Sequence, residues 1–303
     1  MTRSPQNFRL DYQVKPITTG ATNNGMVVHS LSREGKRIVE LVEKRSKVQR
    51  EGLFYAKSYP ILEASAINVP RLYRLEQDSS RGWTIFTEKV EGAMRIPSLD
   101  RDSATALGGY LAELALVQFS HLHKHHMARA LDAGDIATAE QVCEGDEEKA
   151  QCRNILEFLP AIKARLAALP DVTSHNDLNW FNMAVPSDGF VTMPYIFDWD
   201  KVCLNCVGAD LHFFAEQLLR KNNESLGRAL FRGYAERLSR AGLLGASYLR
   251  ENDLILSALV YGLAVRSLWI RKYYADKHRA PTRRTTLQLA RHLNKLTAKG
   301  ELG

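Results

Sequence analysis

Over the first ninety residues, apolar and polar positions alternate in short runs, which is the pattern of half-buried β-strands. The clearest runs are 37–44, 70–76 and 82–92, and residues 14–31 have the pattern of two strands around a tight loop. Polar turn residues separate the runs at 33–36 and 77–81. This arrangement predicts an antiparallel sheet built from consecutive hairpins.

Before Pro97, apolar residues recur about every second position. After Pro97 they recur every three or four positions. Helices with one buried face are therefore expected; their ranges are 103–122, 141–153, 155–169, 213–219, 226–238 and 254–274. Between residues 172 and 197, three short apolar segments interrupt the helical pattern. They predict one small sheet that presents its loop residues at one edge.

The change of pattern predicts an α+β chain with two lobes. Regular strand spacing stops at Glu88–Gly92, so we expect an N-terminal lobe over residues 1–91 and a C-terminal lobe over 92–303. A chain of 303 residues is long enough for two lobes around one cleft.

Composition adds little beyond the class of protein. Hydrophobic residues make up 45% and charged residues 25%, as in ordinary globular chains. The start of the sequence lacks a signal-peptide pattern, and no run approaches the roughly 18 apolar residues of a membrane span. These features predict a cytoplasmic protein without a membrane partner. The lone pair Cys203 and Cys206 favours free thiols in a loop over a zinc site, which needs more ligands.

The formal net charge of +7 is concentrated near the C-terminus. Residues 266–299 contain ten Lys and Arg and one Asp, so the remainder of the chain is close to neutral. Such a face can meet an anionic substrate, a membrane surface or nucleic acid, or can be a solvated helix face. The basic tail alone does not favour nucleic acid as a partner, and the sequence sets no oligomeric state.

The candidate chemistry lies in residues 174–200. Asp177 is followed five residues later by Asn182, and Asp198 ends the apolar segment 195–197. Phosphoryl transfer needs a carboxylate that orients the attacking hydroxyl, together with an amide oxygen and a second carboxylate that hold Mg²⁺ on the nucleotide phosphates. These three residues have the required types in the required order.

The N-terminal lobe contains candidates for binding the phosphates. Gly20 and Gly25 flank small polar residues, including Thr22 and Asn23, so this loop can cover phosphates, although Asn-Gly is also a common hairpin turn. Lys44 ends an apolar strand, and Glu51 in the following helix can form an ion pair with it. Lys36 is the alternative phosphate lysine.

These motifs resemble the aminoglycoside phosphotransferase and choline kinase-like families. The family's catalytic loop, His-Gly-Asp-Leu-His-x-x-Asn, is similar to residues 175–182, and its Ile-Asp-Trp-Glu motif is similar to residues 197–200. Its downstream Gly-x-x-x-Asp-Leu is similar to the segment that ends at Asp210 and Leu211. The resemblance implies a protein kinase-like two-lobed fold, an antiparallel N-lobe and a mainly helical C-lobe.

The resemblance also implies roles. Asp177 would be the catalytic carboxylate, His175 would brace its loop, and Asn182 and Asp198 would hold Mg²⁺. ATP would be bound by Gly20, Thr22, Asn23, Lys44, Glu51 and, at the hinge beside the adenine, Glu88. Three positions depart from the family pattern: Asn176 replaces Gly, Asn179 replaces the second His, and Glu43 replaces an apolar residue before Lys44.

The acceptor is less defined by the sequence. A basic C-terminal lobe argues against polycationic aminoglycosides, and Arg266, Arg271 and Lys272 would suit an anion. We therefore expect a small-molecule hydroxyl acceptor that is neutral or anionic, such as a sugar or amino alcohol. The alternatives are an aminoglycoside or macrolide kinase and a non-catalytic nucleotide-binding protein of the same fold.

Overall fold

The computed structural model describes residues 10–17, 26–47, 49–78, 82–92, 99–119, 122–124, 131–186, 193–220, 223–242, 250–273 and 279–298. The chain forms two compact units, which are described separately. The first comprises Met1–Met94 and Asn182–Lys201, and the second comprises Arg95–Phe181 and Val202–Gly303.

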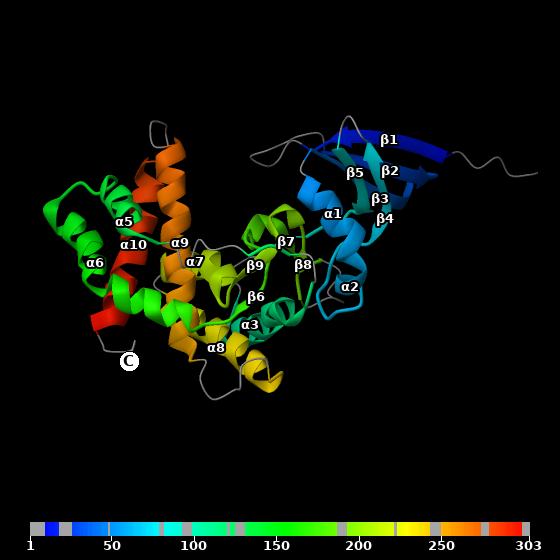
Figure 1. Cartoon of the computed structure of the whole chain (residues 1–303). Coiled ribbons are helices and arrows are strands. Elements are labelled where there is room, and N and C mark those ends of the chain that lie inside the picture. Colours follow the sequence, from blue (N-terminus) through cyan, green and yellow to red (C-terminus); the bar gives the residue numbers. More distant parts are fainter. Residues whose placement is uncertain are drawn as a thin grey trace, which may run out of the picture. The chain divides into compact units, whose positions relative to one another are not determined.

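The first unit contains the expected antiparallel sheet (Figure 1). Its strands are β1 (Leu10–Pro16), β2 (Met26–Arg33), β3 (Lys36–Ser46), β4 (Leu72–Asp78) and β5 (Gly82–Glu88). They lie in the order β1-β2-β3-β5-β4, and every neighbouring pair is antiparallel. The N-terminal half of the predicted fold class is therefore confirmed.

One face of this sheet packs against helix α1 (Gln49–Lys57), and the short helix α2 (Tyr59–Glu63) packs against α1. The approach is close at Gly52, where a Cβ atom would lie 2.0 Å from Cγ of Trp83. Ile85 and Phe54 are each 1% exposed and belong to this core. The predicted helix that contains Glu51 is thus present as α1, and its buried face holds it on the sheet.

Residues 182–201 pack with the first unit, although the sequence pattern assigns them to the C-terminal lobe. They form the short hairpin β7 (Met183–Ala184) and β8 (Tyr195–Ile196). The Trp199 ring stacks on Phe54 with centroids 4.8 Å apart, and the Ile196 N–H donates to the Asn68 carbonyl at 2.9 Å. These contacts account for the difference, because the segment buries its apolar side chains against α1 rather than against its sequence neighbours. The boundary at residue 91 stays a prediction.

The second unit is mainly helical and confirms the other half of the fold class. Its longer helices are α3 (Arg101–Leu116), α5 (Ala133–Glu140), α6 (Asp146–Ala167), α7 (His212–Arg220), α8 (Glu224–Arg240), α9 (Glu251–Tyr273) and α10 (Arg279–Ala298). Helices α3 and α8 touch backbone to backbone. A Cβ atom at Gly108 would lie 1.9 Å from the Leu230 carbonyl oxygen, and one at Gly233 would lie 1.9 Å from that of Thr105.

Two expectations for this unit are wrong. The predicted helices 141–153 and 155–169 are one helix, α6, because its buried residues Cys152, Ile155, Ile162 and Leu166 keep a single helical stripe. The single small sheet that was predicted is in fact two separate strand pairs. One is β7–β8, and in the other β6 (Asp171–Ser174) pairs with β9 (Cys203–Cys206). The segment expected to be a loop at Cys203 is therefore a strand. The four cysteines are all buried free thiols.

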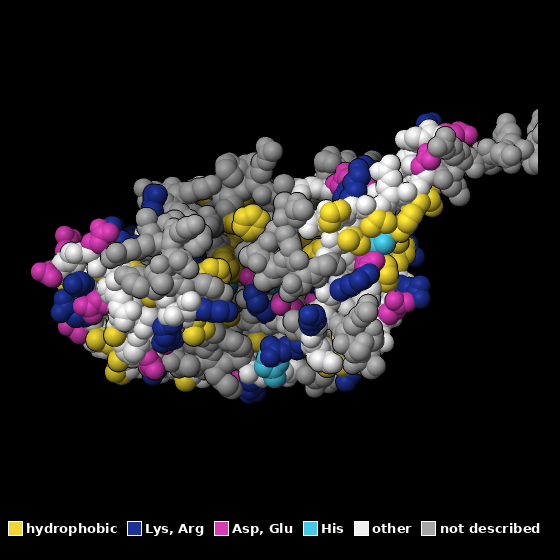
Figure 2. Space-filling model, turned by 90° about the horizontal axis from the view of Figure 1, so that it is seen from above, with side chains coloured by type: hydrophobic (Ala, Val, Ile, Leu, Met, Phe, Trp, Pro, Cys, Tyr) yellow, Lys and Arg dark blue, Asp and Glu magenta, His cyan; other side chains and the backbone are white. Residues whose placement is uncertain are grey.

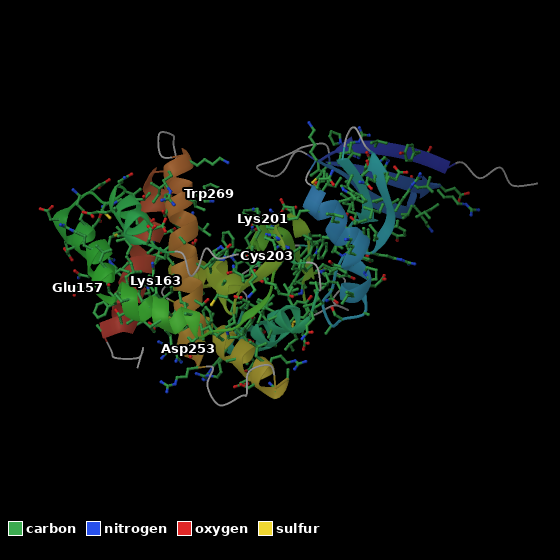
Figure 3. All side chains as sticks on the ribbon, in the orientation of Figure 1. Glu157, Lys163, Lys201, Cys203, Asp253 and Trp269 are labelled. Carbon is green, nitrogen blue, oxygen red and sulfur yellow. The ribbon has the colours of Figure 1, made fainter. Side chains whose placement is uncertain are left out.

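Ion pairs join the basic C-terminal helices to the rest of this unit. Arg266 of α9 pairs with Glu216 of α7, and Arg283 of α10 donates to Glu148 of α6 at 2.6 Å. Asp253, which is labelled in Figure 3, lies toward the other end of α9 and accepts two bonds of 2.6 Å from Arg165. Much of the positive charge that the sequence concentrates here therefore neutralises acidic partners on neighbouring helices.

Helix α9 has the length and composition of a membrane-crossing helix, with a mean hydropathy of 1.5 over its most apolar window. However, 78% of that window is buried inside the protein. Packing against α5, α7, α8 and α10 accounts for its apolar character.

Candidate active site

In the first unit, Lys44 is held between two carboxylates. Its Nζ donates to Oε1 of Glu51 at 2.7 Å and to Oδ1 of Asp198 at 2.5 Å. Burial acts to lower the pKa of Lys44, but Glu51 and Asp198 outweigh it and raise that pKa above its ordinary value. The expected ion pair between Lys44 and Glu51 is present, and Glu51 is only 1% exposed. Lys36 lies at the opposite end of β3, where it is exposed.

The sheet register explains how Lys44 reaches this position. On β3, Lys44 faces Met26 of β2 and Ile85 of β5, on the side that is covered by α1. Glu43 points to the opposite face, where it bonds to His29 at 2.7 Å and accepts from Arg45 at 2.7 Å. The acidic residue before the lysine therefore lies on the opposite face of the sheet from Lys44.

Asp198 follows β8 in a left-handed backbone conformation, with φ of 62°. Two residues later, burial and the negative charge of Asp198 raise the pKa of Asp200 to about 6. Oδ1 of Asp200 is buried and has no hydrogen-bond partner among the residues that the structure describes. A buried carboxylate oxygen of this kind is suited to a cation, so the acidic residues here fit Mg²⁺.

Asn182 lies at the start of the same segment. Its carbonyl oxygen accepts from the Phe197 N–H at 2.9 Å, which ties the beginning of the hairpin to the residue before Asp198. Among the residues that the structure describes, no group of three or more His, Cys, Asp or Glu side chains could hold a metal unaided. This agrees with the way Mg²⁺ usually binds, through one or two carboxylates plus phosphate oxygens.

In the second unit, the loop after β6 is fastened by Asp210. The carboxylate of Asp210 accepts the N–H groups of His175 at 2.7 Å and Asn176 at 2.6 Å. Burial raises the pKa of Asp210, while charge on His175 and the two N–H donors oppose that shift. Asp210 thus supports the loop, and His175 is completely buried within it.

Asp177 itself is oriented by a neighbour that sequence reasoning left without a role. Nδ2 of Asn179 donates to Oδ1 of Asp177 at 2.9 Å, and Oδ1 of Asn179 accepts from the Phe181 N–H at 2.8 Å. The amide therefore links the carboxylate to the following turn. The signal available in the sequence was the Asn in place of the family's second His, because an amide can also donate to a carboxylate.

Asn176, which replaces a glycine of the family motif, has φ of 61°. This left-handed conformation is costly for most residues but accessible to Gly and Asn. Its Nδ2 donates to Sγ of Cys203 at 2.5 Å, and its Oδ1 accepts from Nδ2 of Asn205 at 2.6 Å. Asn176 thus adopts a left-handed backbone that a glycine would also allow, and its side chain joins the loop to β9.

We expect Asn176→Ala to destabilise the second unit more than Asn176→Gly. Alanine loses the side-chain bonds and adds about 1–2 kcal/mol of left-handed strain, whereas glycine loses the bonds alone. Urea denaturation of both variants would measure the difference. Equal free energies of unfolding for the two variants would show that the positive φ is not what selects this residue.

The sequence also pointed to Glu88, to a glycine-containing loop and to basic residues of α9. Glu88 ends β5, where its carboxylate accepts from the Arg71 N–H at 3.1 Å. The predicted loop residues Gly20, Thr22 and Asn23 lie outside the described part of the chain. Arg271, a candidate for binding an anionic acceptor, donates to Asp135 at 2.7 Å, and Arg266 pairs with buried Glu216. These two arginines are therefore neutralised by acidic partners, which removes much of the argument for an anion beside them.

A family model described as "Phosphotransferase enzyme family" matches residues 13–244. No curated protein matches the chain in sequence.

Similar solved structures share the fold at low identity. A microcompartment-associated aminopropanol kinase has a TM-score of 0.61 at 13% identity, covering 97% of this chain and 94% of its own. An aminoglycoside phosphotransferase from Alicyclobacillus acidocaldarius has a TM-score of 0.60 at 14% identity, covering 90% of each chain. A spectinomycin phosphotransferase in complex with ADP and spectinomycin has a TM-score of 0.54 at 14% identity, covering 95% and 93%.

Proposed function

The chain belongs to the phosphotransferase enzyme family, and from this premise we propose that it transfers the γ-phosphate of ATP to a hydroxyl of a small molecule. The observation that carries this proposal is the Lys44 ammonium, which bonds to both Glu51 and Asp198. A lysine aimed by a buried glutamate, with a carboxylate at the end of a strand beside it, is the arrangement that steadies nucleotide phosphates in kinase-like sites.

In this proposal the first unit binds the nucleotide. Lys44 contacts the α- and β-phosphates, and Glu51 holds its ammonium in place. The loop that contains Gly20, Thr22 and Asn23 covers the phosphates, and Glu88 lies at the segment that meets the adenine. Asn182 and Asp198 would hold Mg²⁺, which when bound neutralises charge on the phosphates.

The second unit supplies the group that acts on the acceptor. Asp177 orients the attacking hydroxyl and accepts its proton as the new phosphate ester forms. The bond from Asn179 to one oxygen of that carboxylate fixes its orientation. His175 is completely buried, and its proposed role is to brace the loop.

For the acceptor we propose a hydroxylated metabolite such as a sugar or an amino alcohol. The ion pairs of Arg266 and Arg271 with acidic partners favour a neutral acceptor over an anionic one. An aminoglycoside or macrolide is the alternative within the same chemistry. The reaction is proposed to take place in the cytoplasm.

We expect Lys44→Met to raise the KM for ATP or to lower kcat by at least about tenfold, because the variant loses a charge that contacts the phosphates. Lys36→Met removes the same charge from the exposed end of the same strand and is the matched control. Steady-state kinetics at varied ATP would compare them. If Lys36→Met changed KM or kcat more than Lys44→Met, Lys36 rather than Lys44 would be the residue that binds the phosphates.

The proposed reaction is tested by measuring ADP release with Mg²⁺ and a panel of acceptors. The panel contains sugars, amino alcohols, phosphorylated metabolites, aminoglycosides and macrolides, and Asp177→Ala serves as the blank. Acceptor-dependent ADP release that the blank lacks would support the proposal. Tight ATP binding without turnover on any acceptor class would favour a non-catalytic nucleotide-binding protein.

A further inference from the structure

Strand β1 (Leu10–Pro16) is an edge of the five-stranded sheet. It pairs along its whole length with β2, from Leu10 opposite Arg33 to Pro16 opposite Val27. In the described part of the chain, no strand pairs with its outer side. The strand also carries two apolar side chains in contact with solvent, since Tyr12 is 63% and Val14 is 48% exposed. Unpaired edges with exposed apolar residues are the sheet positions most prone to pairing with another strand.

The β1–β2 hydrogen bonds determine which groups point outward. The Ile17 N–H donates to the Met26 carbonyl at 2.9 Å, and the Ser32 hydroxyl donates to the Asp11 carbonyl at 3.5 Å. Residues with odd numbers therefore direct their backbone groups toward β2. By alternation, Tyr12, Val14 and Pro16 direct theirs to the outer edge. Pro16 lacks an N–H, which is tolerated at such a position.

The outer edge is complementary to itself. Two copies of β1 that pair antiparallel about Gln13 place Tyr12 opposite the partner's Val14, and these outward residues exchange backbone hydrogen bonds. The same register places Asp11 opposite the partner's Lys15, and symmetry repeats that charge pair. Opposite charges that face each other across two strands are stabilising. A slip of two residues in either direction loses both charge pairs.

The side chains on the apolar face are already ordered in one copy. The Tyr12 hydroxyl bonds to Nδ1 of His29 at 2.5 Å, and the two rings stack with centroids 5.9 Å apart. The other ring nitrogen of His29 bonds to Glu43 at 2.7 Å. Tyr12 therefore loses little conformational freedom on pairing. Figure 2 shows hydrophobic side chains gathered along this strand-rich part of the molecule, at the right of the view.

We propose that β1 is a dimerisation strand and that its partner is the β1 strand of a second copy of this chain. The two sheets then join into one continuous sheet across a two-fold axis at Gln13, a closed arrangement in which each copy uses the same surface. One strand pair buries less surface than a typical stable interface, so the dimer forms in a concentration-dependent way. This inference does not depend on the proposed catalytic function.

The test is a charge exchange measured by sedimentation velocity over a range of concentrations. The unaltered chain is expected to pass from monomer to dimer. Asp11→Lys and Lys15→Glu each place like charges opposite one another twice, and each is expected to raise the dimer dissociation constant by about tenfold or more. Mixing the two variants restores opposite charges at both positions, so a heterodimer is expected to form again.

Two further variants separate edge pairing from other causes. Val14→Pro removes an N–H that points outward, so it is expected to weaken the dimer while the β1–β2 bonds remain. Arg74→Glu changes an exposed charge on β4, the opposite edge of the sheet, and is expected to leave the dimer intact. Circular dichroism would check that each variant is folded. A chain that stays monomeric at every accessible concentration, or a dimer that the charge variants leave unchanged, would overturn the proposal.

Discussion

Replacement of Asp177 by alanine is expected to lower kcat by about 100- to 10,000-fold, the usual contribution of a positioned acid or base. The physical reason is that the attacking hydroxyl loses the group that orients it and accepts its proton. Asp177 belongs to the second unit, whereas Lys44, Glu51 and Asp198 belong to the first. Nucleotide binding should therefore change little.

Two measurements on the same protein check this prediction. Turnover is followed by ADP release with the best acceptor of the panel, and ATP affinity is followed by calorimetry. Asp146→Ala, at the exposed start of α6, is a matched control that removes a carboxylate without an expected effect on either quantity. If Asp177→Ala kept normal turnover, the assignment of the catalytic carboxylate would be wrong. If it lost ATP binding as well, the separation of roles between the units would be wrong.

The second large effect is expected at Asp210, where alanine should lower the free energy of unfolding by about 2–6 kcal/mol. The estimate follows from the two buried N–H groups of His175 and Asn176, since each unsatisfied donor costs about 1–3 kcal/mol. These N–H groups belong to the residues just before Asp177. Activity per folded molecule should therefore also fall.

The variant Asp210→Asn distinguishes the effect of side-chain size from the effect of losing a hydrogen-bond acceptor. It keeps the size of the side chain but has one oxygen instead of two, so one N–H loses its acceptor and an intermediate loss of stability is expected. Urea denaturation with circular dichroism gives the free energies, and Asp146→Ala again serves as the control. An Asp210→Ala protein as stable as the unaltered chain would mean that the loop does not depend on this carboxylate.

Much of the fold could be predicted because it follows from local periodicity. The alternation in residues 37–44 and 82–92 is sufficient to predict β3 and β5, and the helical spacing is sufficient to predict α3, α7, α8 and α9. The predicted start of α3 at Ser103 lies close to its start at Arg101, where Asp100 accepts from the Ser103 N–H at 2.7 Å. The predicted end at 122 came too late. The chain turns extended at Val117, whose carbonyl accepts from the Thr173 hydroxyl of β6.

The candidate site, too, could be predicted only in part. The residue types and order of Asp177, Asn182 and Asp198 could be taken from the sequence, as could the spacing of Lys44 and Glu51 across one strand and one helix. The bond from Asn179 to Asp177 and the network of Asn176 could not, because they depend on rotamers and on a strand, β9, that was expected to be a loop. Similarly, the positive charge of the C-terminal helices was visible in the sequence, but its acidic partners were not.

The sequence by itself determined the elements of this chain, the order of its motifs and the family to which they point, because each depends on residues close together along the backbone. Only the tertiary structure decided which distant groups meet. Lys44 and Asp198 are 154 positions apart, yet their side chains bond directly. Residues 182–201 join the first unit because Trp199 is buried against Phe54, and hydrophobic burial depends on proximity in space rather than along the chain.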